Sequence, residues 1–181
     1  MLHCMIDVES LGTQPGSVMC SLGAVAFDAS GIHGHFYQAV SIKSCLDKGL
    51  VVDAGALKFW LTETSNSMRA ALFEKPIGLK EALHEFDQFW QRYECKWLWA
   101  HGSDFDIPLL SACYAAAGYG EFRPWKFRDD RDTRTLYSLV PAGRVNVQRT
   151  TEGHHALRDA EYQAQCVIRA YELIGHQLPE V

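Results

Sequence analysis

The sequence contains no long apolar run and no paired-cysteine motif. No stretch approaches the roughly 18 apolar residues that a membrane-spanning helix needs, so we expect no membrane partner. The six cysteines are widely separated and none forms a CxxC pair, which argues against a zinc ribbon and against a redox dithiol. Several lie in apolar stretches, where cysteine behaves as a small buried hydrophobe. We therefore expect reduced thiols.

Two further absences concern export and charge. Residues 1–4 lack the basic start and the apolar segment of a signal peptide, so we expect a cytoplasmic location. Positive charge is not in excess either, because the formal net charge is -5. A nucleic-acid enzyme with this charge would need bound cations or a local basic patch.

Length and periodicity predict one α/β domain spanning residues 1–181. The sequence has no repeat, linker or low-complexity tract, and its 48% hydrophobic content suits a globular core. Apolar residues recur at three-to-four spacing from Leu79 to Tyr93, which predicts an amphipathic helix. The other expected helices are 53–61, 65–73, 105–117, 133–140 and 155–174. The expected strands are 4–10, 18–27, 35–41, 97–100 and 124–127. This order indicates a mixed five-stranded sheet flanked by helices.

An acidic pair lies in the first predicted strand. A period of two places Asp7 and Glu9 on one face, opposite Cys4, Ile6 and Val8. Two carboxylates that water screens poorly repel each other unless a cation lies between them or one is protonated. An exposed polar strand face is the alternative. A metal-binding strand is our working hypothesis, and it predicts further acids elsewhere in the chain.

Two more acids fit this hypothesis. Asp106 begins a predicted helix directly after a buried strand, where the alternative role is a helix N-cap. Asp104 is a weaker candidate in the preceding loop. Asp159 lies on the apolar side of the last helix, between Ala156 and Ala160. A lone buried carboxylate there is costly unless it is paired, so the alternative is a buried salt bridge.

A histidine completes the candidate set. His154 precedes Asp159 by five residues, which on one helix would place the two side chains about 140° apart. His154 can therefore serve the same site only from the loop before the helix. Histidine titrates near neutral pH and suits general base work. Oxygen ligands favour magnesium or manganese over zinc, and two such ions can cleave a phosphodiester.

The order of these motifs resembles the DEDDh 3'-to-5' exonucleases, a family with a ribonuclease H-like fold. The family pattern is an acid pair on the first strand, then a second-motif Asp, then a His followed by Asp five residues later. Further segments are similar to the ribonuclease T-like branch of phage and bacterial exoribonucleases, and together they cover residues 4 to 172. They are 5–13, 57–61, 68–73, 100–106 and 132–136.

The resemblance assigns roles to individual residues. It implies that Asp7, Glu9, Asp106 and Asp159 bind two Mg²⁺ ions, which Mn²⁺ can replace, and that His154 deprotonates the attacking water. His155 has the wrong spacing for this role. Ser10 and Leu11 match positions that touch the terminal nucleotide in the family. His101 stands where relatives often have Asn, so it either contacts substrate or shapes the loop. The resemblance also implies 3' ends of nucleic acid as partner, a homodimer, and host cytoplasm if the protein is phage-encoded.

Several surface features keep two interpretations each. Trp60 either stacks on a base or belongs to the core. Five cations between residues 123 and 134 form either a solvated mixed-charge face or an edge that guides phosphates: Arg123, Lys126, Arg128, Arg131 and Arg134. The polar run 143–153, with Arg144 and Arg149, is a candidate lid over substrate.

The sequence therefore predicts a 3'-to-5' exonuclease that releases nucleoside 5'-monophosphates, most simply from single strands. DNA and RNA both stay open as substrates. Two other functions are considered: a metal-dependent phosphohydrolase of small nucleotides, and a non-catalytic nucleic-acid-binding domain on the same fold.

Overall fold

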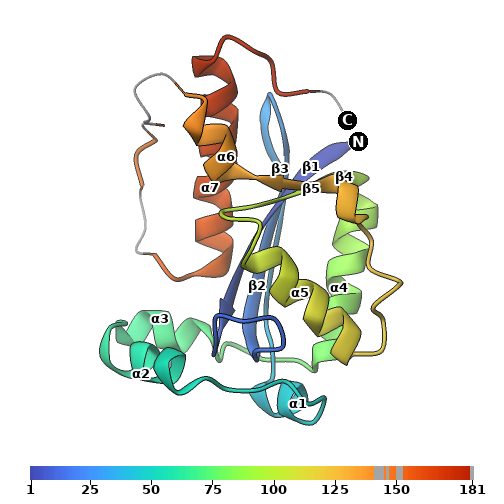
Figure 1. The fold of residues 1–181 in the computed structure, drawn as a ribbon, viewed down its shortest axis with the longest axis vertical. Helices are drawn as coiled ribbons and strands as arrows, with labels where there is room; N and C mark the ends of the chain where they lie inside the picture. The colour runs from blue at the N-terminus through green and yellow to red at the C-terminus, as the bar shows by residue number, and fades with distance from the viewer. Residues whose placement is uncertain (141–144, 146, 150–152, 180–181) are drawn as a thin grey trace.

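A five-stranded sheet runs through the computed structural model, which describes residues 1–140, 145, 147–149 and 153–179 (Figure 1). β1 (Leu2–Ser10), β2 (Met19–Asp28) and β3 (Gly31–Ala39) form an antiparallel meander. β4 (Cys95–Ala100) lies parallel to β1, and β5 (Asp130–Asp132) lies parallel to β4. The strand order is β3-β2-β1-β4-β5. The predicted mixed five-stranded sheet is therefore confirmed.

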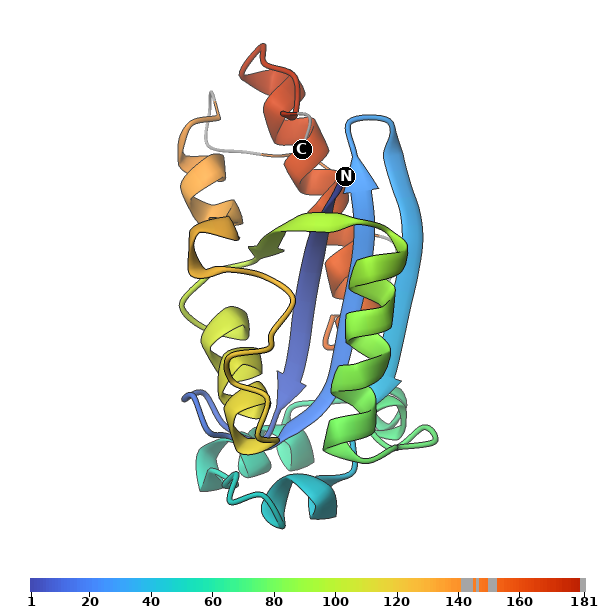
Figure 2. The ribbon, with the colours of Figure 1, turned by 90° about the vertical axis from the view of Figure 1, so that its right-hand side faces the viewer.

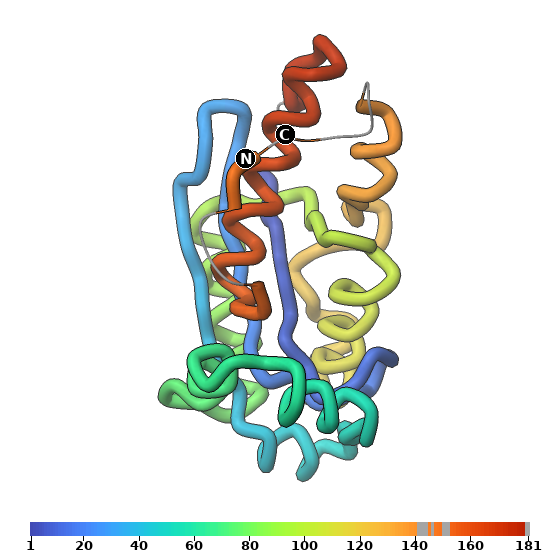
Figure 3. The backbone as a smooth tube through the Cα atoms, turned by 90° about the vertical axis from the view of Figure 1, so that its left-hand side faces the viewer, coloured from blue at the N-terminus to red at the C-terminus, as the bar shows by residue number. Residues whose placement is uncertain are grey.

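Helices cover both faces of this sheet. α4 (Leu79–Arg92) and α5 (Asp106–Ala116) lie on one face (Figure 2), and α7 (Ala156–Leu173) lies on the other (Figure 3). The remaining helices are α1 (Ile42–Leu46), α2 (Ala54–Thr62), α3 (Asn66–Ala71), the 3-10 turn η1 (Phe127–Asp129) and α6 (Thr133–Ser138). Of these, α1 and η1 were not predicted. Within the described ranges, no helix combines the length and the apolar character needed to cross a membrane.

The alternation of β1 divides the core into two layers. Cys4, Ile6 and Val8 pack in the cluster beneath α4 and α5, whereas Met5 packs with the apolar side of α7. This is the period of two predicted from the sequence. Asp7 and Glu9 continue the Met5 face, so both carboxylates point toward the side of the sheet that α7 covers. The side chains in the first turn of α7 are therefore the ones that can contact Asp7 and Glu9.

Small residues allow α7 to approach the sheet closely. A Cβ atom added at Gly23 of β2 would lie 2.2 Å from the backbone of Ala156 and Leu157. Gly23 pairs with Asp7 across the β1–β2 ladder. The helix backbone thus sits directly over a glycine beside Asp7, and this position brings Asp159, in the first turn of α7, to the acidic pair.

One strand was predicted in the wrong place. Residues 124–127 were expected as the fifth strand, but the strand that pairs with β4 is Asp130–Asp132. The apolar signal came from Trp125, which is 2% exposed and packs edge-on against Tyr114 and Phe86 in the core. Its burial reflects packing between helices rather than pairing in the sheet. The observed strand is charged, so its sequence carries no apolar signal.

We predict that Gly23→Ala moves the start of α7 away from the sheet. The added Cβ meets backbone rather than a flexible side chain, so the free energy of unfolding should fall by about 1–3 kcal/mol. Urea unfolding measures this loss, and titration with Mn²⁺ should show weaker binding because Asp159 is displaced. Gly120→Ala is the control, since its Cβ would make only ordinary contact, 3.4 Å from Ala115. Equal stability of the two variants would contradict the prediction.

Candidate active site

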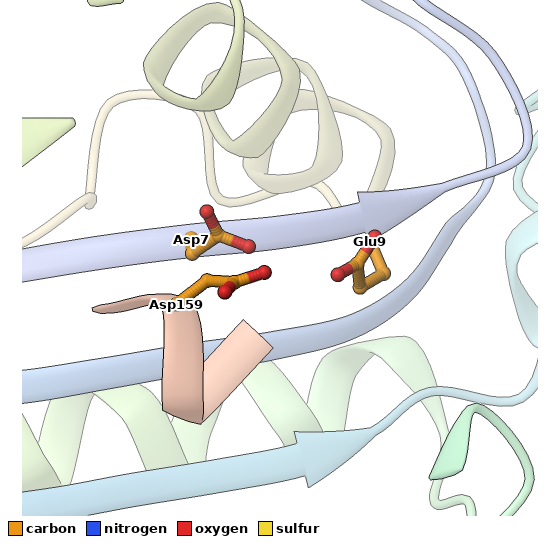
Figure 4. A group of neighbouring side chains, drawn as sticks. All are labelled: Asp7, Glu9 and Asp159. Carbon is orange, nitrogen blue, oxygen red and sulfur yellow. The ribbon is translucent and has the colours of Figure 1, made fainter. Parts of the chain in front are cut away.

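Three carboxylates converge between β1 and the start of α7. Asp7 and Glu9 extend from β1, and Asp159 reaches them from the first turn of α7 (Figure 4). Each residue offers one oxygen atom, and these atoms lie within 4.8 Å of one another. Glu9 and Asp159 are buried, and Asp7 is partly buried. We call these three residues the acidic cluster.

Asp106 lies next to the acidic cluster but on the α5 side of β1. It is the first residue of α5, and its Oδ1 atom accepts a hydrogen bond of 3.0 Å from the backbone N–H of Val8. Phe105 holds the N-cap position, and the α5 N-terminus has no side-chain cap. The N-cap role considered for Asp106 is therefore not what the structure shows. The hydrogen bond to Val8 instead ties the carboxylate to the strand that carries the acidic pair.

Burial and mutual repulsion hold protons on these acids. Burial raises the pKa of Asp7 to about 6. Burial, together with the charges of Asp7 and Asp106, raises the pKa of Glu9 to about 8. Burial and the charge of Asp7 also raise the pKa of Asp106. The raised pKa values show that negative charge is unfavourable here unless a positive charge balances it. A hard divalent cation, which prefers oxygen ligands, could supply that positive charge in place of the protons.

Two further side chains contact the acidic cluster, and sequence reasoning assigned neither of them there. The Arg149 guanidinium pairs with Oδ1 of Asp159. The side-chain N–H of Gln163 donates a hydrogen bond of 2.8 Å to Oδ1 of Asp7, while its own oxygen is buried without a partner among the described residues. Gln163 follows Asp159 by four residues on α7, so it shares the inward stripe. That spacing is the signal that could have identified it.

His154 lies in the loop before α7, as its spacing from Asp159 predicted. Its backbone has a positive φ of 65°, and its N–H donates a hydrogen bond of 2.7 Å to Oδ2 of Asp159. The ring is exposed and packs edge-on against Phe59, with 5.2 Å between ring centroids. Burial, followed by the charge of Arg149, lowers the pKa of His154. The imidazole is therefore neutral at neutral pH and able to accept a proton.

His155 faces a different environment. It is the N-cap residue of α7, and its ring packs on Tyr37, with 4.7 Å between ring centroids. The Nδ1 atom is buried without a partner among the described residues. Of the two adjacent histidines, His154 is the one that borders the acidic cluster.

A groove of about 460 Å³ opens beside Glu9 and His154. Its wall includes Phe59, which is 36% exposed, and Phe105. The other lining residues are Val8, Ser10, Gly12, Thr13, Asp53, Gly55, Ala56 and Trp60. Phe59 was missed as a candidate because a single exposed aromatic residue on a short helix gives no periodic signal.

The four candidate substrate-binding residues occupy different places. Ser10 and Trp60 line the groove, but Trp60 is 5% exposed and its ring N–H donates a hydrogen bond to the backbone oxygen of Ser10. Leu11 is buried in the core beneath α4 and α5. His101 lies at the end of β4, where its Nδ1 atom is 2.8 Å from Oγ1 of Thr133. Leu11 and His101 do not line this groove.

Comparison with known proteins identifies the family. Residues 2–170 match the 3'-5' exoribonuclease Rv2179c-like domain. The chain belongs to this exoribonuclease family. The 3'-to-5' exonuclease family predicted from the sequence motifs is thereby confirmed. Among curated proteins, none matches the chain.

Two solved structures of exonuclease I have the fold of this Rv2179c-like domain. One, reported to suggest how processivity is achieved, superposes with a TM-score of 0.61 and 13% identity and covers 92% of this chain and 40% of exonuclease I. The other is Escherichia coli exonuclease I in complex with a dA16 oligonucleotide, with a TM-score of 0.57, 14% identity, and coverage of 96% and 42%. The chain thus spans about two fifths of the length of exonuclease I. At these identities the likeness shows the fold, and the predicted ribonuclease H-like class is confirmed.

The raised carboxyl pKa values predict how stability depends on pH. In the unfolded chain Asp7 and Glu9 titrate at their ordinary values of 3.8 and 4.5, and in the folded state at about 6 and about 8. Between these limits the folded state binds more protons than the unfolded state, so stability falls as pH rises. Urea unfolding in chelator should show a free energy that is a few kcal/mol lower near pH 8 than near pH 5.

Neutralising the acidic cluster should flatten this dependence. Asp7→Asn removes one charge, and saturating Mg²⁺ or Mn²⁺ compensates the others, so either change should restore stability at the higher pH. A metal-free protein whose stability is flat or rises across this range would contradict the raised pKa values.

Proposed function

We propose that this exoribonuclease-family chain hydrolyses phosphodiester bonds at the 3' ends of single-stranded RNA and releases nucleoside 5'-monophosphates. The observation that carries the proposal is the convergence of Asp7, Glu9 and Asp159 beside an aromatic-walled groove. Acids this close are stable only around a cation or a proton. We propose residues 1–181 as one exonuclease domain.

Four carboxylates would hold two magnesium ions, with manganese as a substitute. The acidic cluster would supply three of them, and Asp106 would supply the fourth from the α5 side of β1. The donor set consists of oxygen atoms, which hard divalent cations prefer. When bound, the two ions would activate a water molecule and stabilise the leaving oxygen. Arg149, now paired with Asp159, would have to release that carboxylate.

His154 would act as the general base. Its ring is exposed at the edge of the groove, next to Glu9, and its lowered pKa keeps the imidazole able to accept a proton. In the reaction the attacking water would give a proton to His154 while its oxygen bonds to phosphorus. The bond from phosphorus to the 3' oxygen of the preceding nucleotide breaks, and that oxygen takes a proton from solvent.

The groove would receive the 3'-terminal nucleotide. Phe59 offers an exposed ring face on its wall, and bases of any sequence stack on aromatic rings. Trp60, buried and hydrogen-bonded to Ser10, would support Phe59 and the β1 end from behind. Homodimer formation and cytoplasmic location stay predictions from the sequence.

Gln163 would orient Asp7 for metal binding. Its amide N–H fixes one oxygen of the Asp7 carboxylate, which leaves the other free to face the cluster. The buried and unpartnered Gln163 oxygen costs about 1–3 kcal/mol. A purely structural side chain at this position could be apolar, so the amide indicates a role at the acidic cluster.

Asp7→Asn and His154→Ala separate metal binding from turnover. We expect Asp7→Asn to abolish both cleavage and Mn²⁺ binding, because it removes a carboxylate of the cluster. His154→Ala should bind Mn²⁺ normally but lose about 10²–10⁴-fold in turnover, the usual contribution of a general base. The measurements are calorimetric Mn²⁺ titration and the stepwise shortening of 5'-labelled strands of RNA and DNA.

Matched controls test the direction and the class of the reaction. His155→Ala should retain most of its turnover, and a strand with a blocked 3' end should resist cleavage whereas a 5'-blocked strand should not. Hydrolysis of free nucleotides but not of strands would instead indicate the phosphohydrolase. RNA binding without cleavage in Mg²⁺ or Mn²⁺ would indicate the non-catalytic domain. Full activity of the Asp7→Asn variant would contradict the assignment of the active site.

Gln163→Leu tests the orienting role. The variant keeps the side-chain volume but loses the donor to Asp7, so Mn²⁺ affinity should fall about 10–100-fold. Turnover should recover when Mn²⁺ is saturating. Gln88→Leu is the control, since Gln88 is an exposed glutamine on α4 whose amide lies 2.9 Å from His84. If Gln163→Leu lowers the melting temperature without changing Mn²⁺ affinity, the residue is merely structural.

A further inference from the structure

Arg134 lies against the loop that leads into Asp106. This arginine is exposed near the start of α6, and its Nη1 atom would lie 2.9 Å from a Cβ atom at Gly102. Gly102 has a φ of +92°, a conformation that favours glycine. The glycine therefore serves two purposes, since it allows the turn and leaves room for the guanidinium against the loop backbone.

Hydrogen bonds tie the start of α6 to the same loop. Asp132 accepts a hydrogen bond of 2.6 Å from the backbone N–H of Ser103 and another of 2.7 Å from Thr135. Next to it, buried Thr133 meets His101 through its hydroxyl. These contacts on either side of Asp132 fix the backbone that carries Arg134, so the guanidinium is held next to the loop rather than on a free surface.

An acidic neighbour of Arg134 lies in the same loop, because Oδ1 of Asp104 is 3.2 Å from the same Cβ position at Gly102. The guanidinium nevertheless lies against Gly102, four residues before Asp106 in the chain. Among the ion pairs that the described residues form, none includes Arg134. Arg149, a second cation among the described residues near the acidic cluster, is already paired with Asp159.

The neighbouring arginines of the 123–134 segment are differently placed. Arg131 donates hydrogen bonds to backbone oxygens of Arg128 and Asp130 and lies over the ring of Trp97. Arg128 lies over the ring of Phe127. Arg128 also lines a pocket with Met1 and Cys95, at the beginning of β4, whereas the loop before Asp106 follows the end of β4. The choice between a solvated face and a phosphate-guiding edge stays open for the segment as a whole, and Arg134 is the member whose guanidinium lies against the loop before Asp106.

We propose that Arg134 binds a backbone phosphate of the RNA strand close to its 3' end. Guanidinium is the side-chain group best matched to phosphate, because its N–H groups form a planar fork. A chain with a net charge of -5 that carries the acidic cluster repels a polyanion, so a cation at the rim of the site that is in none of the ion pairs of the described residues supplies the local attraction. The proposal rests on the proposed function and adds a substrate contact to it.

The test compares RNA binding by Arg134→Gln and Arg134→Lys in an Asp7→Asn background, which prevents cleavage. Arg134→Gln keeps a polar side chain but loses the charge. Fluorescence anisotropy with a labelled single-stranded RNA should show about tenfold weaker binding and a slope of log K against log salt that is smaller by about 0.7, the value for one phosphate contact on a single strand. Arg134→Lys should recover the slope and part of the affinity.

Arg128→Gln is the matched control, because it makes the same change in net charge away from the loop. In the cleaving enzyme, Arg134→Gln should raise KM more than it lowers kcat, which an effect on folding alone would not do. Equal affinity and equal salt slope for the Arg134→Gln and Arg128→Gln variants would overturn the proposal. If the parent protein neither binds nor degrades RNA, the proposed function fails first and the Arg134 contact falls with it.

Discussion

Repulsion among buried carboxylates is the constraint on which this structure depends. Asp7, Glu9 and Asp159 present oxygen atoms within 4.8 Å of one another, where water screens them poorly and their Coulomb energy is large. Burial, together with the charges of Asp7 and Asp106, raises the pKa of Glu9 to about 8, so Glu9 retains a proton at neutral pH. An arrangement so unfavourable for the bare fold persists only because the rest of the protein holds it in place. The proposed cation site would account for this arrangement, because a bound cation relieves the repulsion.

The sheet and α7 supply that restraint. β1 is the central strand, with β2 and β4 on either side. β4 pairs with residues 2–5 of β1, and β2 pairs with the part of β1 that carries Asp7 and Glu9. The backbone at the start of α7 packs against Gly23. The side of α7 that faces the sheet includes three buried alanines, Ala156, Ala160 and Ala164. Small residues at a helix–sheet contact fix distance closely, because no long side chain can adjust. Asp159 cannot relax away from Asp7 without displacing this helix.

How much the sequence reveals depends on the range of the interaction. The alternation of β1, the apolar stripe of α4 and the loop position of His154 follow from local periodicity, and all three were predictable. Gln163 meets Asp7 across 156 residues, and the contact has no local pattern beyond a shared helix face. The prediction of the fifth strand was wrong because it relied on a local signal. The apolar residues around Trp125 suggested a strand, but Trp125 is buried by packing against helix residues.

The proposed metal and RNA would make opposite electrostatic demands on this site. The acids attract cations and repel phosphates, so a polyanion approaches the metal-free cluster only against its charge. A bound cation reverses the sign of the centre, and RNA bound there would in turn favour the cation, since coupling between two ligands is reciprocal. The positive charge of Arg134 does not depend on bound metal, because arginine stays protonated at all ordinary pH values. Under this division the metal would control whether the 3' end can enter, while the arginine guides the strand that follows it.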